Sequence, residues 1–348
     1  MLSMSPTDRG KFPAASTFSP VRRELAGAAL LMAMVLAPAQ PAFAHGGNGG
    51  ASSDYLVEVT GFQGDASGID VHPVELGNRM ELVRTTAKEV QILGYEGEPY
   101  LRLDSDGVFE NTNSPAHYYN LDRYGRSQIP ASASAKAAPN WVKLSDGNSV
   151  RWHDHRTHWM DTLPPPEVRA NPDVERVIFA ANKVDLVVNG SPVEAIIKVT
   201  WLPPPSRLMW LVLTSVTACA LLAALVLLPS MRTYGPALAS VAALASFVGS
   251  GTSTFRIVAS ALALLIALAG WLTKNRWLPA ASAALIVILA VTHFEVFEHR
   301  LLAGWAPAAL QRISITVALA FAAAVVGSEL VSGLGATKPS SVLAANEP

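Results

Sequence analysis

Residues 184–201 read VDLVVNGSPVEAIIKVTW, and this stretch decides the fold of the N-terminal half of the chain. Two apolar runs, Val184–Val188 and Val193–Trp201, flank Asn189-Gly190. Both residues of that dipeptide accept the positive φ angles that a two-residue hairpin turn requires. The stretch therefore predicts an antiparallel β-hairpin.

Upstream of this hairpin the chain has further short strand patterns separated by turn residues. The predicted strands cover residues 54–60, 78–84, 89–93, 101–103 and 108–110, and Asp104–Gly107 reads as the turn between the last two. Strands repeated every 8–12 residues or so are typical of an antiparallel sandwich. We expect residues 45–205 to form an all-β sandwich of immunoglobulin or cupredoxin type.

The C-terminal half predicts a membrane domain over residues 206–330. Charges are sparse there, and apolar runs of about 20 residues are long enough to cross a bilayer. We predict an all-α bundle of five spans, at residues 208–228, 236–251, 255–273, 277–296 and 307–328. The division between the second and third spans rests on residues 249–252, and residues 331–348 are expected to be a disordered tail.

Charge placement predicts which side of the membrane each part occupies. With Arg232, Lys274 and Arg276 inside, the C-terminus is cytoplasmic and the β domain is outside the cell, as the positive-inside rule favours. Arg207, Arg256 and Arg300 then fall outside and weaken the pattern.

The first 44 residues are predicted to be a signal peptide. Arg22 and Arg23 precede an apolar run, and Ala42-Phe43-Ala44 has the small-x-small pattern of a signal-peptidase site. An uncleaved signal anchor is the alternative. Cleavage after Ala44 would make His45 the first residue, so that its α-amine and ring could both bind one metal ion.

Charge and cysteine content exclude several classes of protein. A formal net charge of −1 gives no reason to expect nucleic acid, and neither a phosphate loop nor a dinucleotide fingerprint is present, so no nucleotide is expected. The single cysteine is Cys219, inside the first predicted span. The exported part therefore has neither a disulfide nor the thiolate that a blue-copper site requires.

The strongest candidate site is RWHDHRTHWM, Arg151–Met160, with three histidines in six positions. If residues 149–155 form a strand, His153 and His155 share one face, and His158 follows after a turn. Zinc, copper and nickel all accept neutral imidazole, and the Met160 thioether would help to hold Cu(I). The alternative is a polar loop of hydrogen-bonded histidines. His117, in an aromatic-rich stretch, is a further candidate ligand beside His45.

A second group of polar residues ends the fourth predicted span: His293, Glu295, Glu298 and His299. Ionisable groups beside membrane spans are costly, which favours a functional role such as a relay to the exported domain. On a helix the last three would share a face. The alternative is a set of interfacial side chains that form Glu–Arg pairs between the fourth and fifth spans.

Two stretches, Gly94–Arg102 and Trp152–Met160, together resemble a group of uncharacterised exported multi-span membrane proteins from high-GC Gram-positive bacteria. That resemblance implies the topology and no activity. In the histidine expected at its mature N-terminus, the chain also resembles periplasmic copper-resistance proteins and the copper monooxygenases, a resemblance that implies copper.

We therefore expect a membrane-anchored protein that binds a metal outside the cytoplasm, with a copper ion preferred and zinc as the alternative. Its role would be to bind, deliver or transfer copper at the cell surface, with an exported copper protein or oxidase as partner. One alternative is a non-catalytic envelope protein that binds a protein or glycan through its aromatic side chains. Another is a metalloenzyme with three histidines around an open metal position.

Overall fold

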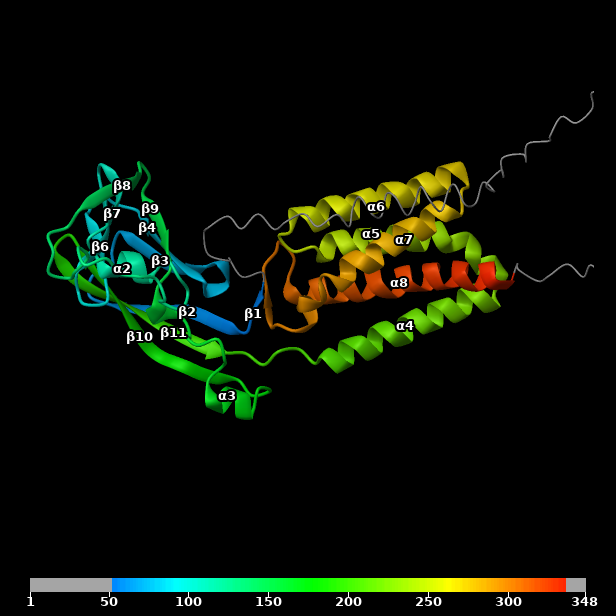
Figure 1. The fold of residues 1–348 in the computed structure, drawn as a ribbon, viewed down its shortest axis with the longest axis horizontal. Coiled ribbons are helices and arrows are strands. Elements are labelled where there is room, and N and C mark those ends of the chain that lie inside the picture. Colours follow the sequence, from blue (N-terminus) through cyan, green and yellow to red (C-terminus); the bar gives the residue numbers. More distant parts are fainter. Residues whose placement is uncertain (1–51, 336–348) are drawn as a thin grey trace, which may run out of the picture. The chain divides into compact units, whose positions relative to one another are not determined.

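The computed structural model describes residues 52–335, a β-rich part followed by a helical part (Figure 1). The predicted signal peptide, His45 and the end of the predicted tail lie outside the described residues.

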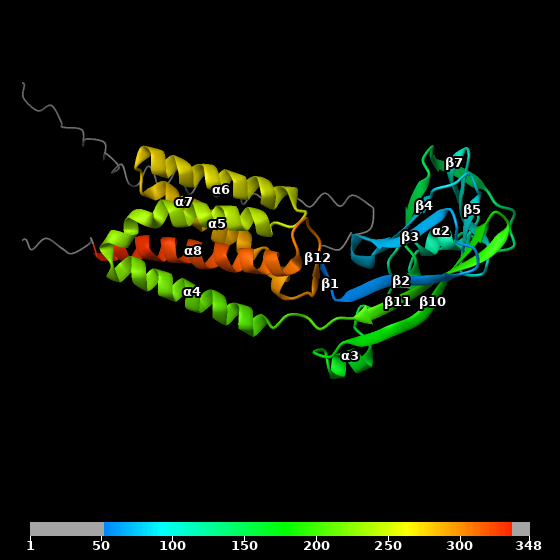
Figure 2. The ribbon, with the colours of Figure 1, turned by 180° about the vertical axis from the view of Figure 1, so that it is seen from behind.

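The β-rich part is built on a seven-stranded antiparallel sheet in the order β2-β11-β10-β5-β6-β7-β8 (Figures 1 and 2). Its strands are β2 (Tyr55–Gln63), β5 (Val90–Leu93), β6 (Pro99–Asp104), β7 (Gly107–Asn111), β8 (Trp141–Ser145), β10 (Arg176–Val188) and β11 (Ser191–Trp201). The predicted hairpin is confirmed as β10–β11, in which Val188 pairs with Ser191. Asn189 and Gly190 have φ angles of 50° and 81°, as this turn requires.

A second antiparallel sheet, in the order β3-β4-β9, contains β3 (Ile69–Val74), β4 (Arg79–Arg84) and β9 (Ser149–Trp152). Two short helices, α2 (Pro115–Tyr119) and α3 (Pro166–Ala170), lie in the connections. Strands β3 and β8 were not predicted. Pro73 interrupts the pattern of β3, and four of the five residues of β8 are exposed, so neither has a clear apolar alternation.

One apolar core joins the two sheets. Met80 and Leu82 of β4 and Trp152 of β9 pack in the same cluster as side chains of the larger sheet, including Ile92 and Ile197. Burying each such side chain stabilises the fold by about 1.5–3 kcal/mol. Because Trp152 is only 3% exposed, the core fixes the position from which the histidine-rich segment leaves β9.

The helical part contains α4 (Arg207–Leu227), α5 (Gly235–Gly249), α6 (Thr254–Thr273), α7 (Trp277–Val291) and α8 (Ala308–Gly335). Three of them, α4, α6 and α8, are long and apolar enough to cross a membrane. Residues 250–253 separate α5 from α6, so the second and third predicted spans are distinct helices. Buried alanines such as Ala242, Ala263 and Ala318 allow α5, α6, α7 and α8 to pack closely.

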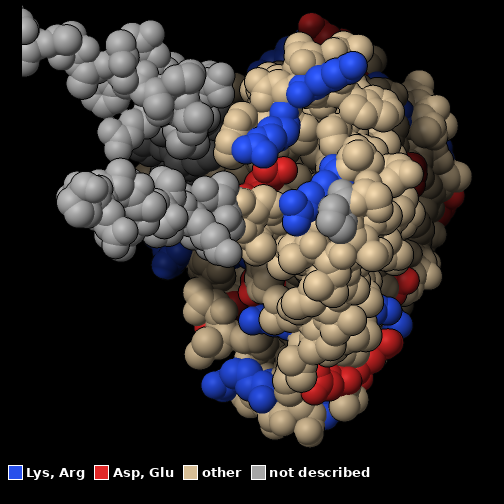
Figure 3. Space-filling model, turned by 90° about the vertical axis from the view of Figure 1, so that its right-hand side faces the viewer, with Lys and Arg blue, Asp and Glu red and all other residues tan. Residues whose placement is uncertain are grey.

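Basic residues mark one end of these helices. Arg232 lies between α4 and α5, while Lys274 and Arg276 lie between α6 and α7, and both connections are at the end where α8 finishes (Figures 1 and 2). Seen from that end, Lys and Arg side chains stand on a mostly uncharged surface (Figure 3).

Candidate metal centre

The histidine-rich segment follows β9 but does not continue as a strand. The expected strand over residues 149–155 ends at Trp152, and His155–Thr157 forms a single 3₁₀ turn. Asp154 begins this turn, since its Oδ1 accepts a hydrogen bond from the backbone N–H of Arg156 (3.0 Å). The expectation that His153 and His155 share one strand face is therefore wrong, and the turn positions the two rings instead.

A buried ion pair holds the turn in place. Asp154 is 1% exposed, and its carboxylate accepts hydrogen bonds from Trp152 Nε1 (3.0 Å) and Arg156 Nη2 (2.8 Å). Arg156 also donates to the carbonyl of Leu93 on β5 (3.0 Å). Burial opposes ionisation of Asp154, but the adjacent guanidinium and the hydrogen bonds outweigh it and lower the pKa of Asp154. The segment is thus tied to both sheets.

The three histidines converge. One ring nitrogen from each of His153, His155 and His158 lies within 4.8 Å of the other two. The Nε2 atoms of His153 and His158 are 2.8 Å apart, and the centroids of these two rings are separated by 4.5 Å. The side chains predicted to share one metal ion are therefore neighbours in the structure.

Backbone carbonyls fix the tautomer of every ring. Nδ1 of His153 lies 2.8 Å from the carbonyl oxygen of Asn78, and Nε2 of His155 lies 3.0 Å from the carbonyl oxygen of Asp122. Nδ1 of His158 lies 3.0 Å from the carbonyl oxygen of the next residue, Trp159. A carbonyl oxygen only accepts hydrogen bonds, so each of these nitrogens carries the proton. The opposite nitrogens, Nε2 of His153 and His158 and Nδ1 of His155, keep their lone pairs, as metal ligands do.

Two of these lone pairs face each other, at 2.8 Å, between His153 and His158. Such a contact is repulsive unless a cation bridges the two nitrogens, or unless one ring carries its proton on Nε2 and donates a hydrogen bond to the other. An additional proton is disfavoured there, because burial lowers the pKa of His153 and takes that of His158 to about 3. Burial also lowers the pKa of His155, and the positive charge of Arg123 acts in the same direction on all three rings. Near neutral pH the site therefore offers three uncharged imidazoles, each with one nitrogen that carries no proton.

Met160 lies close to the ring of His155. A Cβ atom on Gly125 would be 3.5 Å from His155 Nδ1 and 3.8 Å from Met160 Cε, so both side chains border the same glycine. Gly125 has a φ of +64°, a conformation that favours glycine. The loop can thus approach His155 closely, and the Met160 side chain borders the same glycine.

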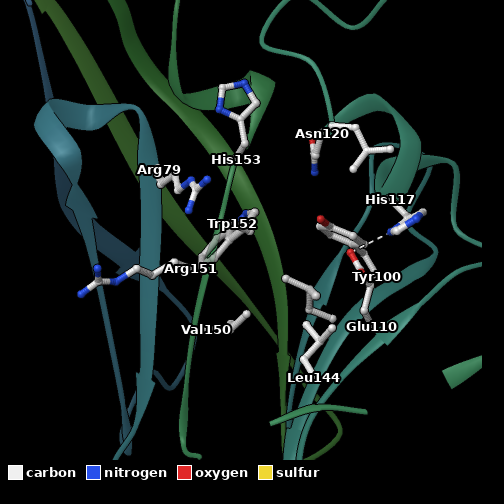
Figure 4. Close-up of a pocket in the computed structure, with 12 residues that line it drawn as sticks. Arg79, Tyr100, Glu110, His117, Asn120, Leu144, Val150, Arg151, Trp152 and His153 are labelled. Carbon is white, nitrogen blue, oxygen red and sulfur yellow. Dashed lines mark ion pairs between the residues drawn. The ribbon is translucent and has the colours of Figure 1, made fainter. Parts of the chain in front are cut away.

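His117 is not part of this cluster. It lies in α2, where its Nδ1 is 2.9 Å from Glu110 Oε1. A cavity of about 200 Å³, lined by both His117 and His153, lies between the two histidines, with Tyr100 and Trp152 on its walls (Figure 4). His117 therefore serves as a control for the three clustered histidines.

The sequence analysis missed Arg123 and the carbonyl groups of Asn78 and Asp122. These groups come from connections distant in the chain, and backbone carbonyls leave no pattern in a sequence. Asp154 binds Trp152 and Arg156 rather than a histidine.

The polar residues after α7 lie in separate contacts. Helix α7 ends at Val291 and Phe294–Phe297 forms a 3₁₀ turn, so the expected common helical face for Glu295, Glu298 and His299 is wrong. The Glu–Arg pairs reach α6 and α4 rather than the last span, with Arg256 3.1 Å from Glu295 and Arg207 3.4 Å from Glu298. His293, which is 5% exposed, has its Nε2 3.8 Å from Glu295.

Arg312 of α8 binds backbone instead of a glutamate. Its guanidinium donates to the carbonyls of Val296 (2.8 Å), His299 (2.6 Å) and Arg300 (2.8 Å). These contacts hold the connection between α7 and α8. In this connection β12 (Leu301–Leu302) pairs with β1 (Ser52–Ser53), the start of the described chain.

His299 joins this connection to the β-rich part. Its Nδ1 donates to Asp54 Oδ2 (2.8 Å), and the N–H of Arg300 donates to Asp54 Oδ1 (2.6 Å). The hydrogen bond to Asp54 raises the pKa of His299 above 6.5. Its stabilising contribution is therefore complete below about pH 6.5 and is lost as the pH rises through the folded-state pKa.

We expect the melting temperature to fall more between about pH 6 and about pH 9 in the wild-type protein than in Asp54→Asn. The asparagine keeps a hydrogen-bond acceptor but removes the charge that favours protonated His299. Thermal unfolding of both proteins in detergent measures the difference. Identical pH profiles would contradict a charged pair between Asp54 and His299.

In comparisons with family models, curated proteins and solved structures, nothing matches this chain.

Proposed function

We propose that this is a membrane-anchored, extracytoplasmic metal-binding protein that handles copper at the cell surface, with zinc as the alternative ion. The observation that supports this most strongly is the convergence of one ring nitrogen from each of His153, His155 and His158 within 4.8 Å, with the Nε2 atoms of His153 and His158 2.8 Å apart. Neutral imidazoles with protonated nitrogens held by carbonyls are the arrangement that metal sites use.

The type of ligand and one of the three ligand spacings are compatible with copper. Cis nitrogens around a square-planar ion, with bonds of about 2.0 Å, are separated by about 2.8 Å, whereas a tetrahedral site requires about 3.3 Å. The separation of 2.8 Å between the Nε2 atoms fits the first geometry, which Cu(II) prefers. The Met160 thioether beside His155 would favour retention of the ion after reduction to Cu(I). Binding and delivery to an exported copper protein or oxidase is the corresponding role.

The proposal includes a topology. The two sheets with their shared core would form the extracytoplasmic β-sandwich, and α4 to α8 would form five spans. The basic end of the helices, with Arg232, Lys274 and Arg276, favours a cytoplasmic position for that end. His45 remains a predicted further ligand, supplied by removal of the signal peptide after Ala44.

Metal binding to the full-length protein, purified in detergent, tests the proposal. We expect one Cu(II) per chain, and at least about a tenfold loss of affinity in His153→Ala and in His158→Ala, because each removes one nitrogen of the facing pair. Titration against a competing chelator measures the affinity. His117→Ala is the matched control and should bind copper as the wild type does.

Unchanged copper affinity in both His153→Ala and His158→Ala would contradict the proposed site. The same titration with Zn(II) compares the two ions, and tighter zinc binding would replace copper as the preferred metal.

A further inference from the structure

A cavity of about 250 Å³ borders His158, one of the three clustered histidines. His158 and Arg123 line it together with Asn78, Tyr55 and the first described residues, Ser52 and Ser53. Since one water occupies about 30 Å³ in the liquid, the cavity has room for a ligand of a few non-hydrogen atoms together with water. The cavity is therefore lined by a candidate metal ligand (His158), a positively charged side chain (Arg123) and the hydroxyl groups of Tyr55, Ser52 and Ser53.

Arg123 supplies positive charge to this cavity without a carboxylate partner in the described part of the chain. Its Nη1 donates to the side-chain oxygen of Asn78 (2.6 Å), and no Asp or Glu of residues 52–335 forms an ion pair with it. A divalent ion on three neutral imidazoles would add two further charges close by. The site as a whole would then be strongly cationic, which favours an anionic ligand.

Carboxylates close in sequence to the cavity and the histidines already have partners, and Asp54, between the lining residues Ser53 and Tyr55, accepts hydrogen bonds from His299 and from the backbone N–H of Arg300. Asp122 lies 3.1 Å from Arg126, and Asp154 lies 2.8 Å from Arg156. Glu75 also lines the cavity, but its carboxylate is 3.6 Å from Arg79. The compensating negative charge is therefore expected from outside these side chains.

The backbone on the cavity wall is strained. Glu75 and Leu76 have φ angles of 54° and 57°, although neither is a glycine. Left-handed conformations of such residues are unfavourable, and they concentrate at ligand sites, where the surrounding structure maintains them. Tyr55 lines the same cavity, and burial raises its pKa to about 12, so its hydroxyl remains a hydrogen-bond donor.

We propose that this cavity binds a small carboxylate, one oxygen of which completes the coordination of the metal on His153, His155 and His158 while the other accepts a hydrogen bond from Arg123. The inference rests on the metal site proposed above. A planar carboxylate matches the guanidinium fork, and charge-assisted hydrogen bonds of this kind are among the strongest in proteins.

Acetate added to the copper-loaded full-length protein in detergent is the probe. We expect acetate to change the electron paramagnetic resonance spectrum of Cu(II) in a saturable manner. Replacing Arg123 with Met should weaken acetate binding about tenfold or more and leave one copper per chain, because the arginine contacts the anion and not the metal. Arg123→Lys keeps the positive charge but not the planar pair of N–H donors, and its acetate affinity should lie between those of the wild type and Arg123→Met.

Arg169→Met, which removes an exposed arginine of α3, is the matched control and should bind acetate as the wild type does. A copper spectrum that does not respond to acetate would overturn the inference, and so would equal acetate affinity in wild type and Arg123→Met. Acetate binding that appears only after deletion of residues 45–51 would assign the cavity to that segment and would also overturn it. Failure to bind copper in the first place is a separate result, which would refute the proposed function.

Discussion

Replacing Asp154 with alanine is expected to lower the free energy of unfolding by about 3–5 kcal/mol, the cost of breaking a buried ion pair from one side. The substitution leaves the guanidinium of Arg156 and the indole N–H of Trp152 without their common acceptor. It also removes the cap of the turn that carries His155. Tryptophan fluorescence during denaturant unfolding in detergent measures the change.

The same variant should bind copper more weakly, because the turn that places His155 between its neighbours loses its anchor. Asp154→Asn retains an acceptor for the cap and is expected to lie between wild type and Asp154→Ala in both measurements. Asp146→Ala, which removes an exposed surface pair with Lys143, should unfold as the wild type does, because solvent screens such a pair. A loss of under about 1 kcal/mol in Asp154→Ala would show that the pair does not hold the turn.

Arg312→Met is expected to destabilise the helical part by about 2–4 kcal/mol. Methionine keeps most of the apolar volume but removes the donors for three backbone carbonyls between α7 and α8. Buried acceptors left without partners cost about 1–3 kcal/mol each, and water that enters the space would recover part of that cost. The melting temperature in detergent should fall accordingly.

Arg300→Met provides the matched control, because Arg300 is an exposed arginine in the same connection and its contribution there is through its backbone. It should melt close to the wild-type temperature. Equal melting temperatures for Arg312→Met and wild type would mean that water satisfies these carbonyls as well as the guanidinium does.

The elements that could be predicted from the sequence are those whose signals are local. The β10–β11 hairpin follows from Asn189-Gly190 between apolar strands, and the starts of the helices follow from long uncharged runs. The end of α7 could not be predicted in the same way. Apolar and aromatic residues continue past Val291, so the sequence pattern does not mark the end of the helix. Arg312 donates a hydrogen bond to the carbonyl oxygen of Val296 and thereby stabilises a connection that is no longer α-helical.

The site, like the fold, has features that local sequence signals predict and features that they do not. Three histidines in six positions pointed to one cluster, but strand alternation was the wrong reason for their convergence, since the Asp154–Arg156 pair bends the segment into a turn. The distant groups that orient the rings could not be predicted from the residues next to the histidines in the sequence. The carbonyls of Asn78 and Asp122 are distant from the histidines in the sequence and reach them only in the folded structure.

The short β1–β12 ladder has a consequence for biosynthesis. Ser52 and Ser53 leave the ribosome early, whereas their partners Leu302 and Leu301 are translated only after four of the five helices. The ladder and the Asp54–His299 contact therefore cannot form on a nascent chain that stops before residue 299. The core shared by the two sheets contains no residue of α4 to α8, so the β-rich part can pack before these helices are translated. Closure of the ladder therefore marks a chain whose translation is nearly finished.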